Sequence, residues 1–216
     1  MQIIDPRYEI LTPISEGGMD ELKMIEKIAR VCYKSESHIT EDGESAKKLI
    51  TALIRSGHEA MLEHGIISVK FTVDRGVSHE IVRHRMASFA QESTRYCNYS
   101  GDKFGNELTF IKPSFFDGPD RMGAYNRWLK SMEAAEKNYM KLMSLGAKPE
   151  EARSVLPNSL KTEIVVTANY REWRHIFALR TSHRAHPQIR EVMIPLMLEL
   201  RDRIPVIFDT LGEDER

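Results

Sequence analysis

Residues 66–73 alternate between apolar and polar side chains, and this alternation constrains the fold more than any other stretch. One side of the segment collects the apolar residues Ile67, Val69, Phe71 and Val73. A period of two with β-branched residues is typical of a half-buried strand. Asp74 follows at once and can cap a short helix that carries Val77, Ile81 and Val82. The sequence therefore predicts a strand that runs straight into a helix, with Arg83-His84-Arg85 at the helix end.

The rest of the chain alternates helical and extended patterns without a repeat or a linker. Helical spacing predicts helices over 20–32 with Asp20 as cap, over 45–56 closed by Gly57, and over 120–145 stopped by Gly146. Pro149 is expected to open a short helix, and residues 160–168 to form a strand followed by two helices, the later one interrupted by Pro195. We therefore expect an α/β (α+β) protein. It would have a mixed or antiparallel sheet flanked by helices, in one domain over residues 1–216 with a long helical excursion.

Charge and composition narrow the classes of partner. The chain has 216 residues, with 31 Lys and Arg against 32 Asp and Glu, so its formal net charge is −1. Such a balance gives no global field toward nucleic acid or an anionic membrane, and any anion site must be local. The two cysteines form no Cys-x-x-Cys, and no leader or long apolar segment is evident. A reduced, cytoplasmic protein that neither crosses nor joins a membrane is the expectation.

Residues 83–96 concentrate guanidinium, imidazole, amide and hydroxyl groups. Arg offers a rigid fork of donors for phosphate oxygens, while Gln and Glu can pair with the edge of a planar ring. An Arg-rich run is also common at a solvated helix end or in a nucleic-acid-binding patch. Arg83 and Arg85 would point about 200° apart on a helix, which favours two anionic ligands over one.

A second set of polar groups lies on the helix expected over 169–180. Arg180 shares the apolar stripe of Trp173, Ile176 and Phe177, where an unpaired cation would be costly. It can pair with a core carboxylate, lie just beyond the helix end, or face a cleft and meet an anionic ligand. Arg171 and His175 are neighbours on the opposite side of this helix.

Metal and thiol chemistry find little support in the spacings. His58-Glu59 begins like a zinc-protease motif, but the next histidine, His64, lies two positions beyond the required interval. His183 and His186 have no accompanying carboxylate or cysteine at a recognised distance. Cys97 follows the basic cluster, yet a lone thiol is usually a packing residue. We expect no metal and no cysteine nucleophile.

The Arg-His-Arg tripeptide, seven residues and then Ser93-x-Arg95-Tyr96 resemble the signature of the flavin-dependent thymidylate synthases. Three further segments are similar to blocks of that family: residues 57–64, Arg153-Ser154-Val155-Leu156-Pro157, and Asn169-x-Arg171 followed by Leu179-Arg180. The resemblance extends over most of the chain, from residue 28 to about residue 189. Ala60, His175 and Glu80 depart from the family's usual residue types.

The resemblance implies a site for each ligand. FAD would be held by Arg83, His84, Arg85, Gln91, Asn169, Arg171 and His175. The nucleotide dUMP would be bound by Glu80, Arg83, Gln91, Glu92, Ser93, Thr94, Arg95, Arg153 and Arg180. Arg180 would be the catalytic residue, placed against the uracil edge to stabilise negative charge.

The same resemblance implies the reaction and the assembly. The expected chemistry is reductive methylation of dUMP to dTMP, with 5,10-methylenetetrahydrofolate as carbon donor and NADPH as the source of electrons for FAD. Family members are homotetramers whose active sites lie at subunit junctions. The rival classes are a nucleic-acid-binding module built on 83–95 and a phosphate-handling hydrolase. The first lacks a basic global charge, and the second lacks a recognisable metal or nucleophile set.

Overall fold

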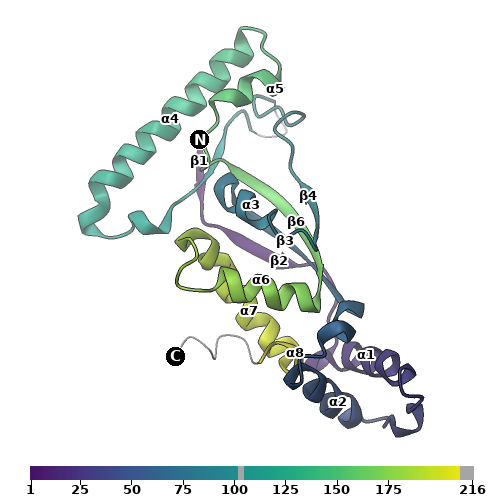
Figure 1. Ribbon diagram of the computed structural model, residues 1–216. Helices are drawn as coiled ribbons and strands as arrows, with labels where there is room; N and C mark the ends of the chain where they lie inside the picture. Colours follow the sequence, from purple (N-terminus) through teal and green to yellow (C-terminus); the bar gives the residue numbers. More distant parts are fainter. Residues whose placement is uncertain (102–104, 210–216) are drawn as a thin grey trace. The chain divides into compact units, whose positions relative to one another are not determined.

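Strand β3 (Ile66–Asp74) and helix α3 (Arg75–Ile81) follow one another without an intervening residue (Figure 1). The computed structural model describes residues 1–101 and 105–209. The side chains of Ile67, Val69, Phe71 and Val73 are fully buried. Asp74 caps α3, because its carboxylate accepts a hydrogen bond of 2.8 Å from the Val77 N–H. The strand, its buried side and the cap predicted from the sequence are thus confirmed.

Helices and short strands make up the remaining elements. The other strands are β1 (Gln2–Ile4), β2 (Arg7–Ile10), β4 (Ser88–Gln91), β5 (Thr109–Ile111) and β6 (Lys161–Asn169). The other α-helices are α1 (Met19–Val31), α2 (Glu44–Arg55), α4 (Met122–Ser144), α5 (Pro149–Ala152), α6 (Tyr170–Arg180), α7 (Pro187–Arg203) and α8 (Pro205–Phe208). Short 3-10 turns include η3 (Glu59–His64) and η7 (Arg153–Val155).

Two sheets contain all of these strands. The larger sheet has the order β2-β3-β6-β4, and β1 pairs with β5 in a separate parallel pair. Ile3 lies opposite Phe110 in the parallel pair, and an isolated antiparallel bridge joins Phe110 to Leu160. The expected mixed sheet flanked by helices is confirmed, and α4 is the expected long helical excursion.

The described residues form two compact units, which we call unit 1 and unit 2. Unit 1 comprises residues 1–8, 70–83 and 89–165. Its apolar cluster is built where α4 presents Met132 and Tyr139 to buried residues around β5. The rings of Tyr139 and Tyr99 lie 5.8 Å apart between centroids. Two residues of the amphipathic pattern of α4, Met132 and Tyr139, thus pack in a core, one of the two uses, core or subunit packing, that its Met and aromatic stripe indicates.

Unit 2 comprises residues 9–69, 84–88 and 166–216, of which 210–216 lie outside the described part. Helix α1 packs on α2, and α6 packs on η3 and α7. Trp173, at the centre of α6, is fully buried and donates a 3.0 Å hydrogen bond from its indole N–H to the Ile67 carbonyl. This contact fixes α6 against β3 within the unit.

Three local expectations were wrong or incomplete. Asp20 lies inside α1, whose N-cap is Gly18 with φ of 68°. Helix α7 continues through Pro195 rather than being interrupted there. The strands β1, β2, β4 and β5 have only three or four residues each, too few to show a period in the sequence.

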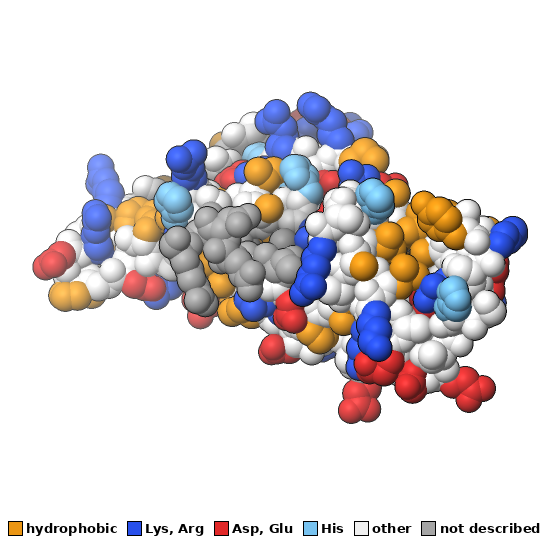
Figure 2. Space-filling view, turned by 60° about the horizontal axis from the view of Figure 1, so that its bottom comes forward, with side chains coloured by type: hydrophobic (Ala, Val, Ile, Leu, Met, Phe, Trp, Pro, Cys, Tyr) orange, Lys and Arg blue, Asp and Glu red, His pale blue; other side chains and the backbone are white. Residues whose placement is uncertain are grey.

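The surface carries both charges in mixed order. On the face drawn in Figure 2, basic and acidic side chains are interspersed among apolar ones, as the near-zero net charge leads one to expect. No helix among the described residues combines the length and hydropathy needed to span a bilayer.

Gly65 provides a test of packing in unit 2. A Cβ at this position would lie 2.0 Å from Cε2 of Tyr170, a side chain that is almost completely buried. We expect Gly65→Ala to lower the free energy of unfolding by about 2 kcal/mol, because the ring cannot move without repacking the core. The midpoint of urea unfolding, followed by circular dichroism, measures this change.

Gly123→Ala is the matched control. Nothing lies within 4 Å of a Cβ added at Gly123, in the first turn of α4. This variant should be as stable as the wild type or up to about 1 kcal/mol more stable. Equal midpoints for the Gly65 and Gly123 variants would contradict the packing argument.

Candidate functional site

Strand β4 and the turn after it carry the first group of predicted site residues, all in unit 1. Gln91, at the end of β4, donates from its amide to the hydroxyls of Ser78 at 2.9 Å and Thr162 at 3.2 Å. Because both hydrogen atoms of the amide are used, its orientation is fixed by α3 and β6. The Gln91 side chain therefore has a fixed orientation at the candidate site.

Glu92 is anchored inside unit 1. Its carboxylate accepts hydrogen bonds from the Lys161 ammonium at 2.9 Å, the Tyr99 hydroxyl at 2.9 Å and the Glu163 N–H at 3.1 Å. Burial raises the pKa of Tyr99 above its ordinary value, and the Glu92 charge raises it further, so the phenol remains a proton donor. Three donors occupy this carboxylate, which fixes the start of the turn.

The residues after Glu92 form a compact group of anion-binding type. The Ser93 hydroxyl accepts from the Arg95 N–H at 3.3 Å, and the Arg153 guanidinium donates to the Thr94 hydroxyl at 3.5 Å. Arg95 is 54% exposed, lies 5.3 Å from the centroid of the Tyr96 ring and 3.9 Å from a Glu150 oxygen. Two guanidinium groups beside two hydroxyls suit a phosphate oxygen set. We call Ser93, Thr94, Arg95 and Arg153 the anion group.

Helix α6 carries most of the second group, which lies in unit 2. Asn169 caps the helix, accepting a 2.8 Å hydrogen bond from the Glu172 N–H through its side chain. Trp173, Ile176 and Phe177 are buried, so the accessible polar groups of α6, among them Arg171 and His175, lie on the other side of the helix. Arg180 is the last residue of the helix and is only partly buried.

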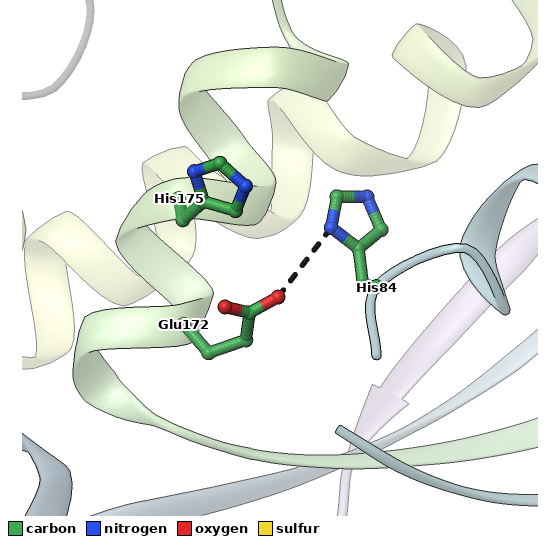
Figure 3. Close-up of side chains that lie close together, drawn as sticks. All are labelled: His84, Glu172 and His175. Carbon is green, nitrogen blue, oxygen red and sulfur yellow. Dashed lines mark ion pairs between the residues drawn. The ribbon is translucent and has the colours of Figure 1, made fainter. Parts of the chain in front are cut away.

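The His84 side chain lies between Arg180 and Glu172. Its Nε2 accepts a 2.9 Å hydrogen bond from Nε of Arg180, and its Nδ1 lies 3.5 Å from a Glu172 carboxylate oxygen (Figure 3). The imidazole is 5% exposed. Its ring meets that of His175 edge to face, with 6.0 Å between centroids. Arg180, His84 and Glu172 thus form a chain of side chains, which we call the Arg180 chain.

The His84 imidazole is neutral at pH 7. An ion pair with Glu172 would keep the ring protonated, but burial acts in the opposite direction and is the larger effect. Burial, together with the charges of Arg180 and His175, lowers the pKa of His84 to about 4. Burial also raises the pKa of the Glu172 carboxyl group, while His175 lowers it by less.

A pocket of about 510 Å³ opens beside α6 in unit 2. Its lining includes Asn169, Arg171 and His175, all predicted to hold a cofactor, together with Glu59, Glu63, Met86, Glu172, Arg174 and Ala178. Arg171 is half exposed and pairs with Glu63 at 2.6 Å. Arg174 pairs with Glu59 at 3.2 Å and also donates to the Ile207 carbonyl. Accessible guanidinium, amide and imidazole groups beside a Met side chain fit a ligand with phosphate groups and a flat ring.

The cluster of His84, Glu172 and His175 also has the composition of a metal site. One ligand atom from each residue lies within 4.8 Å of the others. Sequence spacing did not find this cluster, because His84 is far from helix α6 in the chain. However, Nε2 of His84 already accepts from an arginine, and its proton therefore sits on Nδ1, the nitrogen that faces Glu172.

The structure divides the predicted site residues between the two units. Unit 1 holds Glu80, Arg83, Gln91, Glu92, Ser93, Thr94, Arg95 and Arg153, and unit 2 holds His84, Arg85, Asn169, Arg171, His175 and Arg180. The helical argument for Arg83 and Arg85 was wrong, because α3 ends at Ile81 and both residues lie in the turn that follows. Both side chains are exposed.

Sequence reasoning missed Glu172, Lys161 and Tyr99. Glu172 could have been noticed, because Asn169-x-x-Glu172 matches the spacing of a capping box. Lys161 carries no local signal, since it pairs with Glu92 from 69 residues away. Tyr99 lies only seven residues after Glu92, but in a segment without a regular period that would have indicated the contact.

Comparisons with known proteins identify the family of the chain. The family described as "Thymidylate synthase complementing protein" matches residues 17–206. A flavin-dependent thymidylate synthase from Corynebacterium aurimucosum is 30% identical over 212 residues, covering 91% of this chain and 82% of the relative. Another, from Pyrococcus abyssi, is 33% identical over 174 residues, covering 79% of this chain and 69% of the relative.

A solved structure shows the same fold. The crystal structure of a UMP/dUMP methylase, PolB from Streptomyces cacaoi, bound with 5-Br dUMP, matches with a TM-score of 0.77. The two chains are 25% identical, and the match covers 97% of this chain and 96% of the other.

The candidate site combines guanidinium groups with hydroxyl, amide and imidazole groups, on a mixed sheet flanked by helices. This combination is typical of an enzyme that binds phosphorylated ligands. The chain belongs to the flavin-dependent thymidylate synthase family, since the family match includes nearly the whole chain. It is accordingly an enzyme of the methyltransferase class with a flavin as its cofactor. The family resemblance inferred from the sequence motifs is confirmed.

Because His84 is neutral in the folded chain, we predict that the protein loses stability as the pH falls. The pKa of His84 is about 4 in the folded chain and about 6.5 in the unfolded chain. Below pH 6.5 the unfolded chain therefore takes up a proton that the folded chain does not, and stability is lost down to about pH 4. We expect this loss to be on the order of 2–3 kcal/mol. Urea unfolding at a series of pH values between 7 and 4 measures it.

His84→Gln, which cannot take up this proton, should lose less stability over the same pH interval. His183→Gln is the control, because His183 is exposed and its substitution should leave the wild-type pH profile in place. Parallel profiles for the wild type and the His84 variant would show that His84 titrates as in water.

Proposed function

We propose that this protein converts dUMP to dTMP by reductive methylation, with FAD as its cofactor. One observation carries the proposal: a family match over residues 17–206 includes every predicted site residue. The hydrogen bond by which His84 holds the Arg180 guanidinium at a helix end in unit 2 adds support. Residues 1–216 would act as one flavin-dependent thymidylate synthase-like domain, because the matched segments belong to both units.

FAD would be held mainly by the pocket beside α6. Arg171 offers a half-exposed guanidinium for phosphate, and His175 and Asn169 offer groups for the edge of a ring. His84, Arg85, Arg83 and Gln91 complete the proposed cofactor set. When bound, FAD supplies the hydride that completes the methyl group.

The anion group of unit 1 would hold the phosphate of dUMP. Arg95 and Arg153 supply charge, and Ser93 and Thr94 supply hydroxyl donors. Glu80, Arg83, Gln91 and Glu92 are proposed to contact the nucleotide as well. Since Glu92 is occupied by three internal donors, its contribution is to hold the turn. Glu80, a carboxylate, would meet dUMP away from its phosphate or through water.

Arg180 would be the catalytic residue. Its guanidinium would lie against the uracil and stabilise the negative charge that develops when the ring is activated. A guanidinium keeps its charge at every physiological pH, so it serves this purpose without a proton transfer of its own.

The remaining partners follow from the family. We propose 5,10-methylenetetrahydrofolate as carbon donor, NADPH as reductant and a homotetramer with active sites at subunit junctions. Nucleic acid and membrane are not among the proposed partners. A cytoplasmic location is proposed because Cys32 and Cys97 are both free.

The first test is the colour and activity of the purified protein. We expect a bound-flavin absorption band, and formation of dTMP from dUMP only when methylenetetrahydrofolate and NADPH are both supplied. UMP should be assayed in parallel, since the Streptomyces cacaoi relative is named for both nucleotides. Colourless protein that takes up no added FAD and makes no dTMP would refute the proposal.

The second test removes the proposed catalytic cation. Arg180→Ala should lower kcat by about 100-fold or more, because loss of a group that stabilises developing charge commonly costs that much. Bound flavin and the unfolding midpoint should change little. Arg203→Ala is the matched control, since Arg203 is 46% exposed and pairs with Glu199 within helix α7. Equal activity of the two variants would remove Arg180 from the mechanism.

A further inference from the structure

Helix α6 holds both ends of the Arg180 chain. Glu172 lies in its first turn and Arg180 is its last residue. Their Cα atoms are separated by roughly 12 Å of helix rise. Side chains on a helix lean toward its N-terminus, so Arg180 can reach back and meet a group placed between the two. His84 occupies that place, contacting Arg180 with one ring nitrogen and facing Glu172 with the other.

The hydrogen bond from Arg180 settles where the proton of His84 lies. Arginine is only a donor, so Nε2 of His84 must present its lone pair. A neutral imidazole carries one proton, and that proton is then on Nδ1. If the proton moved to Nε2, two N–H groups would face each other and the hydrogen bond from Arg180 Nε to His84 would be lost.

Glu172 explains why the His84 proton lies on Nδ1. Its carboxylate oxygen, 3.5 Å from Nδ1, is an acceptor and favours a proton on that nitrogen. The carboxylate is 11% exposed, so water competes poorly for it. Its backbone is fixed by the Asn169 cap. A group that holds the tautomer of a histidine commonly decides which of its nitrogens can accept.

We propose that Glu172 is a positioning residue: by fixing the proton of His84 on Nδ1, it keeps Nε2 free to orient the Arg180 guanidinium. The proposal rests on the proposed function, in which Arg180 acts on the nucleotide. It assigns to Glu172 no contact with substrate or reacting atoms.

Three proteins test the proposal by kinetics: the wild type, Glu172→Ala and Glu172→Gln. We expect Glu172→Ala to lower kcat by about 10- to 100-fold, as loss of an outer supporting group does in other sites. KM for dUMP and the Kd for FAD should change by less than about 3-fold, since ground-state binding is retained. Glu172→Gln should restore most of kcat, because its amide oxygen can still face the Nδ1 proton as an acceptor. Glu44→Ala, at an exposed pair with Lys47, is the matched control.

The tautomer itself gives a readout that needs no turnover. Nitrogen NMR of histidine-labelled protein, with His84 assigned through His84→Gln, distinguishes protonated from unprotonated ring nitrogens. The wild type and Glu172→Gln should carry the proton on Nδ1, and Glu172→Ala should show a mixture. A wild-type protein that makes no dTMP but shows this pattern would refute the proposed function and leave the tautomer assignment standing.

Several results would overturn the proposal. The first is wild-type kcat in Glu172→Ala, and the second is a proton on Nε2 of wild-type His84. A third is weak FAD binding in Glu172→Ala with full kcat at saturating FAD, which would make Glu172 a cofactor contact. The last is inhibition of the wild type by micromolar Zn²⁺ that Glu172→Gln abolishes while showing no kcat difference without zinc. That outcome would assign the cluster of His84, Glu172 and His175 to a metal.

Discussion

A guanidinium resting on a buried, neutral imidazole is the interaction on which the unit 2 site depends. Arg180 keeps its charge because nothing in the protein can deprotonate it, and His84 stays uncharged because burial and the adjacent cation both oppose protonation. The pair therefore fixes a permanent positive charge at a helix end. A charge oriented in this way can stabilise an anionic ligand.

The two groups of site residues are held by different means. In unit 1, Glu92 gathers an ammonium, a phenol and a backbone N–H, so a carboxylate organises a turn whose outer groups are basic. In unit 2, helix α6 does this work through its cap and its buried face. Both arrangements use internal hydrogen bonds to fix the site groups before a ligand binds. Binding and catalysis by orientation require such fixed groups.

The sequence predicted the long elements and the residue types of the site, because both leave local patterns. Strand β3, helix α4 and the Asp74 cap follow from period and capping chemistry alone. Strand β4 has four residues and no visible period, and the roles of Glu172 and Lys161 depend on partners far away in the chain. Tyr99 reaches Glu92 from seven residues away, within a segment that has no regular period. The misplaced helix at Arg83–Arg85 has the same origin: nothing local marks the end of α3 at Ile81. Motif recognition supplied the candidate site residues, whereas the side chains that hold them required coordinates.

One rigid helix carries Asn169, Arg171 and His175 for the proposed cofactor and Arg180 for the proposed nucleotide. A displacement of α6 would therefore alter both sets of contacts at once. If flavin binding restrains the helix, it lowers the cost of ordering the guanidinium that the nucleotide meets. Thermodynamic reciprocity then requires the nucleotide to strengthen flavin binding by the same factor. Under the proposed function, the helix would couple the occupancies of the two ligands without a separate regulatory element.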